Sequence, residues 1–401
     1  MKITNELGPL QLVEEGKARI YVPLLEAYRD EKGHIDPARA PVFYNPRMIA
    51  SRDLAVAAIE AYVRGRRLSQ IKLAEPFCST GVRGIRYAIE VDEVLKVVMG
   101  DISKKAITLT KINVKLNNIN AKTEVLHCEA NMLLSIHAKR SERFDVIDID
   151  PFGSPAPFIY NALRALKNEG LLAVTATDLP PLFGIYPLAC RRKYLSIPLR
   201  TDYAPEVGLR ILLGFIAREA AKLEAGIIIL LAYYMDHYLR VYTLIRKGAK
   251  EADKALDQLG YILHCNKCGW RGVQSGLIPD TIESCPICAT KLRKSGPLWL
   301  GSLGDVGFLT RLRQEIINRD YLRERKRLLK LVDKILQEVS IRTPFYYTVS
   351  ELAKYLGINE VKPRMLVERL RSNGYKASLT HFNPKGVKTE VDITLLLELL
   401  K

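Results

Sequence analysis

The sequence predicts an α/β protein with a mostly parallel sheet, followed by a smaller C-terminal domain of the α+β class. Short apolar segments and helical patterns alternate between residues 50 and 250, which is typical of parallel strands joined by helices that cover both faces of a sheet. Beyond residue 260, this alternation gives way to two closely spaced pairs of cysteines, a basic helix and a compact tail. The length of 401 residues is enough for two or three domains, each with its own core.

The parallel part reads as a helix over 51–63 followed by five strands with helices between them. The strands are expected at residues 71–77, 94–101, 123–130, 143–153 and 170–178. Helices are expected within residues 78–90, 104–119, 156–166 and 206–226. The apolar segments 227–234 and 240–247 that follow could form an antiparallel pair.

The apolar pattern fades at residues 247–262, and we place a domain boundary there, between a domain of residues 1–250 and one of residues 251–401. The second domain contains a basic helix predicted over 310–336. Its tail reads as helix, helix and hairpin, an order that resembles a winged helix-turn-helix.

Charge and apolar content limit the partners of the chain. The formal net charge is +17, from 61 Lys and Arg against 44 Asp and Glu, which favours a polyanion such as RNA or DNA. The longest purely apolar run, 227–235, is far shorter than the roughly 20 residues of a membrane-spanning helix. The first residues also lack the apolar core of a signal peptide. We therefore expect a cytoplasmic protein with no membrane contact, and no obligate protein partner is evident.

Four of the seven cysteines form the pattern C-x2-C-x16-C-x2-C, between residues 265 and 288. They are Cys265, Cys268, Cys285 and Cys288. This spacing is typical of a tetrahedral zinc site, whereas four unligated thiols would not predict two matched pairs. Because four thiolates leave no open coordination position, we expect one structural Zn²⁺.

Several strands of the predicted sheet end in residues suited to an adenosine-like ligand, which open α/β sheets bind beyond the carboxyl ends of their strands. After the first strand, Ser79, Thr80, Gly81 and Gly84 form a small-residue loop that lets a ligand approach the backbone. It lacks the G-x-G-x-x-G pattern, which disfavours a nicotinamide cofactor. Asp101 ends the second strand and can accept from ribose hydroxyls, and Glu129 ends the third and can accept from an adenine amino group. Asp150 ends the fourth strand.

This order of elements resembles Rossmann-like class I methyltransferases that use S-adenosyl-L-methionine, and Asp150-Pro151-Phe152-Gly resembles the D/N/S-P-P-Y/F/W motif of exocyclic-amine methyltransferases. An amino group on a base is a poor nucleophile because its lone pair is delocalised into the ring. Hydrogen bonds to the Asp150 carboxylate and the Pro151 carbonyl would return that lone pair, and the carboxylate would stabilise the positive charge that develops on nitrogen. Phe152 could stack on the flipped base. Asp148, on the same strand face as Asp150, is a supporting candidate.

Six strings occur in order and extend the resemblance to nearly the whole chain, from about Val13 to the tail. They are "VFYNPRM", "STGVRGIR", "MGDIS", "DIDPFGSP", "VTATD" and "THFNPKGVKT". Together they resemble the tRNA (guanine-26-N2,N2)-dimethyltransferase family. The resemblance implies S-adenosyl-L-methionine as methyl donor, tRNA as partner, two methyl transfers to N2 of one guanine, and a tRNA-binding domain at residues 251–401.

The resemblance also implies roles for individual residues. Arg47 and Arg83 would contact the methyl donor, with Arg86 as an alternative to Arg83. The remaining donor contacts would come from Asp101 at the ribose and from Glu129 with the Ala130 backbone at the adenine. Asp150 would be catalytic, and the guanine would be held by Phe43, Pro151 and Phe152.

The basic part of the C-terminal domain is expected to contact tRNA phosphates. Residues 311–330 carry eight Lys or Arg against three Asp or Glu, and Lys385 and Lys388 add charge in the tail. A solvated, salt-bridged helix face is the alternative reading. Two other functions also stay open at this point: an rRNA guanine-N2 or DNA adenine-N6 methyltransferase, and an inactive zinc-stabilised RNA-binding protein.

Overall fold

The computed structural model describes residues 6–278 and 282–400. The contacts within the chain divide it into two compact units. Unit 1 comprises Met1–Pro151, Tyr160–Ala173 and Thr310–Lys330, and unit 2 comprises Phe152–Ile159, Val174–Leu309 and Leu331–Lys401. The boundary that the sequence suggests near residue 250 stays a prediction.

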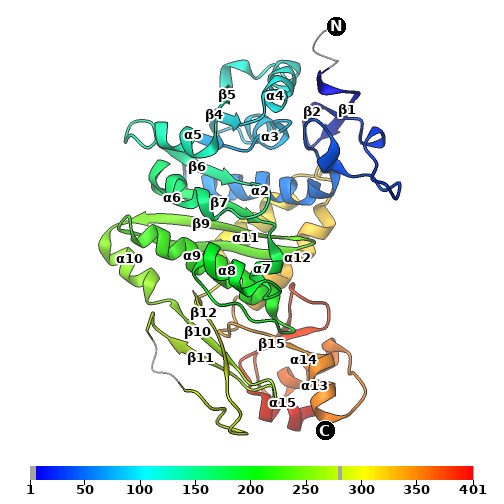
Figure 1. Cartoon of the computed structure of the whole chain (residues 1–401), viewed down its shortest axis with the longest axis vertical. Helices are drawn as coiled ribbons and strands as arrows, with labels where there is room; N and C mark the ends of the chain where they lie inside the picture. The colour runs from blue at the N-terminus through cyan, green and yellow to red at the C-terminus, as the bar shows by residue number, and fades with distance from the viewer. Residues whose placement is uncertain (1–5, 279–281, 401) are drawn as a thin grey trace. The chain divides into compact units, whose positions relative to one another are not determined.

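The central sheet has seven strands in the order β5-β4-β3-β6-β7-β9-β8 (Figure 1). Their bounds are β3 Ile71–Glu75, β4 Val94–Asp101, β5 Thr123–His127, β6 Phe144–Ile149, β7 Leu166–Ala176, β8 Ala225–Met235 and β9 Tyr238–Lys247. Strand β3 pairs in parallel with β4 and β6, β4 pairs in parallel with β5, and β8 pairs antiparallel with β9. The predicted α/β class and the predicted antiparallel pair are thus confirmed.

The helices that follow these strands are α3 Val82–Glu90, α4 Lys104–Leu116, α5 Ala130–Ile136 and α6 Ala156–Ala165. Helix α3 packs on β4, and α4 packs on β5, as Figure 1 shows. Helix α2, Ile49–Arg66, precedes the sheet and is buried at every position from Ala50 to Val63. Its many alanines leave it apolar on nearly all sides, which is the pattern of a helix enclosed in a core.

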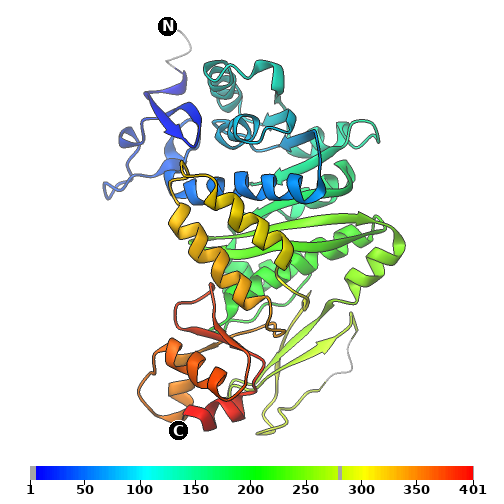
Figure 2. The same ribbon diagram turned by 180° about the vertical axis from the view of Figure 1, so that it is seen from behind.

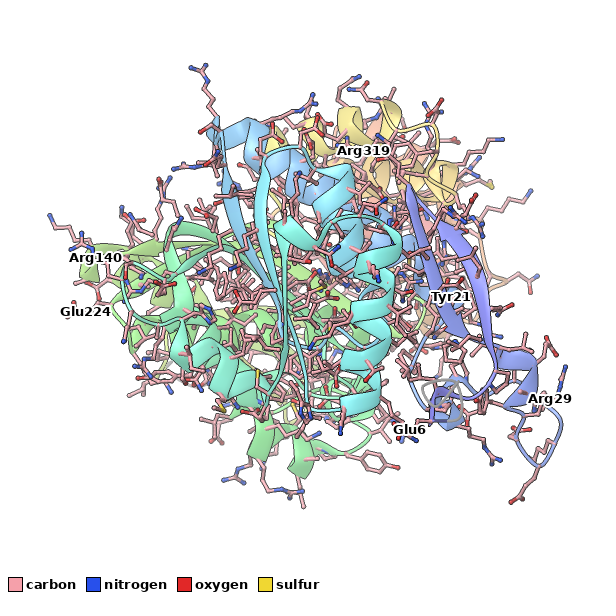
Figure 3. All side chains as sticks on the ribbon, turned by 90° about the horizontal axis from the view of Figure 1, so that it is seen from above. Glu6, Tyr21, Arg29, Arg140, Glu224 and Arg319 are labelled. Carbon is pink, nitrogen blue, oxygen red and sulfur yellow. The ribbon has the colours of Figure 1, made fainter. Side chains whose placement is uncertain are left out.

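A β-hairpin near the N-terminus was not anticipated from the sequence. Its strands, β1 Leu10–Glu15 and β2 Ala18–Pro23, pair antiparallel around Gly16. Figure 3 shows Tyr21 on this hairpin and Arg29 in the connection after it. The hairpin is fixed to α4 because the Tyr21 backbone donates to Asn113 Oδ1 at 2.7 Å and accepts from Asn113 Nδ2 at 3.0 Å.

Two arginines and three carboxylates form a buried ion network in unit 1, and none of the five residues is more than 6% exposed. Arg86 contacts Asp53 and Glu90 at 2.7 Å and Glu15 at 3.1 Å, and Arg52 contacts Glu15 at 2.5 Å. Burial alone would raise the pKa of Glu15, but Arg52 and Arg86 outweigh it and hold that pKa at about 2. The network joins β1, α2 and α3, and it occupies Arg86 with carboxylates instead of a ligand.

The predicted single helix over 310–336 is wrong, because two helices occupy this region: α11 Val306–Ile317 and α12 Arg325–Glu338 (Figure 2). Long-range contacts hold the connection between them. The Glu324 backbone N–H donates to Asp53 Oδ2 at 3.1 Å, and Arg323 Nη2 donates to the Glu14 carbonyl at 3.0 Å. Arg325 Nη2 also donates to the Ile317 carbonyl at the end of α11, at 2.6 Å. Arg323 and Arg325, two of the basic residues expected to contact phosphate, therefore donate hydrogen bonds within unit 1.

Unit 2 carries the remaining helices of the first 260 residues, which are α7 Leu179–Leu182, α8 Pro187–Tyr194, α9 Ala204–Ala221 and α10 Ala249–Leu256. A three-stranded antiparallel sheet of order β11-β10-β12 follows, from β10 Leu259–His264, β11 Arg271–Ser275 and β12 Arg293–Trp299. The tail consists of β13 Tyr347–Thr348, α13 Val349–Leu356, α14 Pro363–Ser372, β14 Ala377–Leu379, β15 Gly386–Thr389 and α15 Ile393–Leu400. Its helix, helix and hairpin order matches the expected winged arrangement.

Within the described ranges, none of the helices combines the length and apolar composition needed to cross a bilayer.

The buried network predicts that two arginines of unit 1 contribute very differently to the free energy of unfolding. Arg86→Met should destabilise the fold by about 3–5 kcal/mol, because it leaves buried carboxylates without their cation. Arg64→Met is the matched control. Arg64 also pairs with two carboxylates, Glu60 and Glu315, but its side chain is 56% exposed, so the loss should stay below about 1 kcal/mol. Equal shifts of the urea midpoint in the two variants would contradict this.

Candidate active site and metal centre

The loop after β3 is shaped for a close approach to its backbone. Gly81 begins α3 with φ of 79°, a left-handed conformation that favours glycine. A Cβ there would also lie 2.8 Å from the Thr110 side chain. At Gly84 a Cβ would lie 2.6 Å from the Glu75 carboxylate, which accepts the Gly84 N–H at 2.8 Å. The glycines of "STGVRG" thus allow two close contacts, as well as the turn.

A chain of hydrogen bonds connects Asp101 at the end of β4 to Phe43. Asp101 accepts from the backbone N–H groups of Ser79 at 2.9 Å and Ser103 at 2.8 Å, which fixes the carboxylate at this edge of the sheet. The Ser79 hydroxyl donates to the Phe43 carbonyl at 2.6 Å. The segment "VFYNPRM" is therefore held to the loop after β3 by Ser79, a residue that the sequence predicted only as a small member of that loop.

Asp150, at the end of β6, lies in a cluster of three carboxylates around one guanidinium. Arg83 forms an ion pair with Asp150, and its other terminal nitrogen lies 3.7 Å from Asp148 Oδ2. The buried Tyr87 hydroxyl donates to Asp148 at 2.6 Å. Asp148 and Glu75 are buried, whereas the Asp150 side chain is 22% exposed. The carboxylate at position 150 is thus the one of the three that faces outward.

Glu75 is a member of this cluster that sequence reasoning missed. Burial raises its pKa well above the usual range; Arg83 opposes this shift, and the charges of Asp148 and Asp150 add to it. The signal was available in the sequence, since "KLAEPF" ends a strand in an acid as the strands ending in Asp101 and Asp150 do. Its place in the cluster becomes evident only in the structure, where the Glu75 carboxylate is buried and accepts the Gly84 backbone N–H.

The other residues predicted for the donor site lie on separate elements. Glu129 is the N-cap of α5 and accepts from the Met132 backbone at 3.0 Å. Ala130 follows in the first turn of α5, where backbone N–H groups have no acceptor within the helix. Arg47 is exposed in the short 3-10 helix Pro46–Met48, whose N-cap is Asn45. Ser79 connects Asp101 to Phe43, and Arg83 at the start of α3 pairs with Asp150, while Arg47 and Glu129 lie on other elements.

The turn that follows Asp150 and Pro151 presents Phe152 with 75% of its surface exposed. Gly153, with φ of 81°, exchanges two hydrogen bonds with Thr177. Its N–H donates to Thr177 Oγ1 at 2.8 Å, and its carbonyl accepts from the Thr177 N–H at 3.0 Å. The motif "VTATD" therefore holds the "DPFG" turn in place. An exposed phenyl ring on a pinned turn is suited to stack on a planar group.

The four cysteines of the C-x2-C pairs are arranged to hold a metal ion. Their sulfur atoms all lie within 4.8 Å of one another. Three of the separations are 3.5, 3.5 and 3.6 Å. Tetrahedral zinc with Zn–S bonds of about 2.3 Å requires sulfur atoms about 3.8 Å apart, so the site fits zinc. The metal would be structural, with all four positions taken by thiolates.

The two cysteine pairs form matching loops. The carbonyl of the first cysteine in each pair accepts from the residue four positions on, Gly269 or Ala289, at 3.0 and 2.9 Å. Both of these residues have positive φ, 75° and 56°. Ala289 thus adopts a conformation that its partner loop gives to glycine, and the two loops wrap one centre symmetrically.

Arg271, in β11, connects the two cysteine loops to the rest of unit 2. Its guanidinium lies 4.1 Å from the ring centre of Tyr203 and 4.3 Å from that of Tyr347. It also forms an ion pair with Asp202 at 2.9 Å, and Asp202 in turn accepts from Thr348 Oγ1 at 2.9 Å. Arg271 and Asp202 therefore connect the cysteine loops to the tail.

Lys388 does not contribute an exposed charge for phosphate contact, contrary to the expectation. It is 3% exposed, and its ammonium donates to Glu206 of α9 at 2.5 Å. His381, in the same motif, bonds Glu338 at 2.8 Å. Lys385 is exposed and pairs with Glu360 at 2.8 Å. The string "THFNPKGVKT" mainly packs the tail inside unit 2.

The fold and its acidic strand ends are those of Rossmann-like class I methyltransferases. The family model described as N2,N2-dimethylguanosine tRNA methyltransferase matches residues 16–401. The tRNA (guanine(26)-N(2))-dimethyltransferases of Methanobrevibacter smithii and Pyrococcus horikoshii are 36% and 38% identical to this chain, and each match covers at least 97% of both proteins. Trm1 from Pyrococcus horikoshii, solved with S-adenosyl-L-methionine, is similar with a TM-score of 0.84 and 37% identity, covering 97% of this chain and 99% of that one. The chain belongs to the N2,N2-dimethylguanosine tRNA methyltransferase family.

The cysteine geometry predicts about one zinc per chain in freshly purified protein. Cys265→Ser should lose the metal and lower the thermal unfolding midpoint, because the two loops then lack their common centre. Cys128→Ser, a single thiol outside the cluster, should keep its zinc. Elemental analysis of the three proteins checks this, and a metal-free wild type would show the assignment to be wrong.

Proposed function

We propose that this protein transfers methyl groups from S-adenosyl-L-methionine to N2 of guanine 26 in tRNA, giving N2,N2-dimethylguanosine, and that it does so in the cytoplasm. Membership of the family and the similarity to Trm1 in complex with the donor support this proposal. The observation that carries it is the outward-facing Asp150 carboxylate at the end of β6, directly before Pro151 and the exposed Phe152.

In this proposal the donor lies along the carboxyl ends of β3, β4 and β5. Asp101 accepts from the ribose hydroxyls, and its two backbone donors leave further lone pairs on each oxygen for this purpose. Glu129 and the Ala130 N–H meet the adenine. Arg47 meets the donor's carboxylate, and Arg83 is the second residue proposed for that contact. When bound, the donor supplies an electrophilic methyl group on sulfur.

The target guanine is proposed to have its amino group at Asp150 and the Pro151 carbonyl, and Phe43 and Phe152 are the two aromatic residues proposed to hold its ring. Hydrogen bonds to these acceptors localise the N2 lone pair. The new N–C bond would form as the methyl group leaves the donor sulfur, Asp150 would stabilise the positive charge on nitrogen, and the proton of that nitrogen would pass to water. A second round on the same nitrogen gives the dimethylated product.

Arg83 has a further role in this proposal, because its ion pair orients the Asp150 carboxylate. Ser79 has the corresponding role for Phe43, through its hydrogen bond to the Phe43 carbonyl. Each of these residues connects the loop after β3 to a residue proposed to touch guanine, so donor and acceptor would be positioned by one loop.

Asp150→Asn should lower the methylation rate by about 10²–10³-fold, since it removes the charge that stabilises the cationic nitrogen. Donor affinity should change little, because the proposed ribose and adenine contacts lie elsewhere. Asp92→Asn, at an exposed position before β4, is the control and should keep full activity. Mass spectrometry of nucleosides from unmodified tRNA measures both methylation steps. Near-normal turnover in Asp150→Asn would remove this residue from the mechanism, and methylation of rRNA or DNA in preference to tRNA would overturn the substrate.

Asp101→Ala, unlike Asp150→Asn, should mainly affect donor binding. The binding free energy of the donor should weaken by about 1–3 kcal/mol, because a charged hydrogen-bond partner is lost. Isothermal titration calorimetry with the donor measures this. At saturating donor, methylation of tRNA should largely recover. Unchanged donor affinity would exclude Asp101 from the ribose site.

A further inference from the structure

Residues 185–197, which contain helix α8, expose an unusual number of large apolar side chains. Five of them are at least 50% exposed: Ile185, Tyr186, Leu188, Leu195 and Ile197. Scattered exposed apolar residues need no explanation, but a concentration within thirteen residues marks a binding surface. We call residues 185–197 the α8 ridge.

The α8 ridge is rigid, because its inner face is firmly packed. Cys190 and Tyr194 are completely buried, and the Tyr194 ring meets Phe215 of α9 edge-on at 5.7 Å. Arg218 of α9 donates to the carbonyls of Tyr194 at 2.6 Å and Leu195 at 3.0 Å, which satisfies the end of α8. The exposed side chains therefore lie on, or directly beside, a helix whose inner face is packed against α9.

The charge of the α8 ridge favours a polyanion over an apolar protein partner. Arg191, Arg192 and Lys193 are consecutive and exposed. Asp178 pairs with Lys193 at 3.0 Å, and in the part of the chain that the structure describes neither arginine has an ion-pair partner. Aromatic side chains beside unpaired guanidinium groups are the combination that binds unstacked nucleotides, with rings on bases and cations on phosphates.

The α8 ridge is also fixed to the turn that presents Phe152. The Ser154 hydroxyl bonds the Tyr194 hydroxyl at 2.8 Å, and Tyr194 donates to Asp178 at 2.7 Å. Asp178 directly follows Thr177, which holds Gly153. The C-terminal end of α8 and the "DPFGS" turn are therefore joined within unit 2 by a short hydrogen-bonded path.

We propose that the α8 ridge is an RNA-contact surface for the nucleotides beside the methylated guanosine, with Tyr186 stacking on an unstacked base and Arg191 and Arg192 contacting phosphates. The inference rests on the proposed function, since it takes tRNA as the substrate and Phe152 as a contact of the target base. A guanosine that leaves its stack exposes its neighbours, and a rigid ridge beside the base site can hold them.

The proposal is tested with the full-length enzyme and unmodified tRNA. Tyr186→Ala should weaken tRNA binding by roughly 5- to 150-fold, the range expected for losing one stacked base. Tyr186→Phe should restore binding, because it keeps the ring. Arg191→Ala with Arg192→Ala should reduce the slope of log affinity against log salt by about 1.4–1.8, as expected for two lost phosphate contacts. Donor affinity should be unchanged in all of these variants.

Lys139→Ala with Arg140→Ala is the matched control, because it removes two exposed consecutive charges from the connection into β6, at the amino end of the strands (Figure 3). It should leave the salt slope close to that of the wild type. Equal tRNA affinity in the wild type and in the α8 variants would overturn the proposal. So would a change in sedimentation mass of Tyr186→Ala without a change in tRNA affinity, which would identify the ridge as a self-association surface. Failure of the proposed function is distinguishable, because the wild type itself would then not methylate tRNA.

Discussion

The buried guanidinium of Arg86 is the constraint on which the arrangement of unit 1 depends. Three carboxylates from β1, α2 and α3 meet it, and each would be costly to bury without a cation. Asp53 belongs to this network and also accepts the Glu324 backbone N–H, so the segment between α11 and α12 is held at the same point. Glu15 further accepts from Tyr44, which directly follows Phe43. One ion network therefore fixes the helix that carries Arg83 and the segment that carries Phe43.

A second guanidinium, that of Arg83, lies in a cluster built differently. Here also three carboxylates lie around one arginine, but one of them, Asp150, is partly exposed. Burial raises the pKa of Glu75 well above its usual range, and the nearby Arg83 opposes this shift. The Arg86 network is thus buried throughout, whereas the Arg83 cluster has one partly exposed carboxylate, Asp150.

The sequence allowed the parallel sheet, its acidic strand ends and the cysteine centre to be predicted, because each depends on residues close together in the chain. Strand ends are marked by a short apolar run and the acid that follows it, and the cysteine loops by their own spacing. The break between α11 and α12 was not predictable in this way, because Asp53, which holds it, lies 271 residues from Glu324. The burial of Lys388 likewise depends on Glu206, 182 residues away. A charged residue in a basic segment reads as solvent-exposed until its distant partner is known.

Five of the six strings that resemble the family divide into two kinds when their contacts are considered. "STGVRGIR", "MGDIS" and "DIDPFGSP" place backbone groups and carboxylates at one edge of the sheet, where a ligand can reach them. "VTATD" and "THFNPKGVKT" have structural contacts instead. Thr177 holds the turn of Phe152, and Thr175 accepts from the buried Arg240 at 2.7 Å. In the tail string, His381 bonds Glu338 and Lys388 bonds Glu206. A string shared with a family therefore does not imply contact with the substrate. Because the tail string is largely buried, changes within it should act through the folding of unit 2.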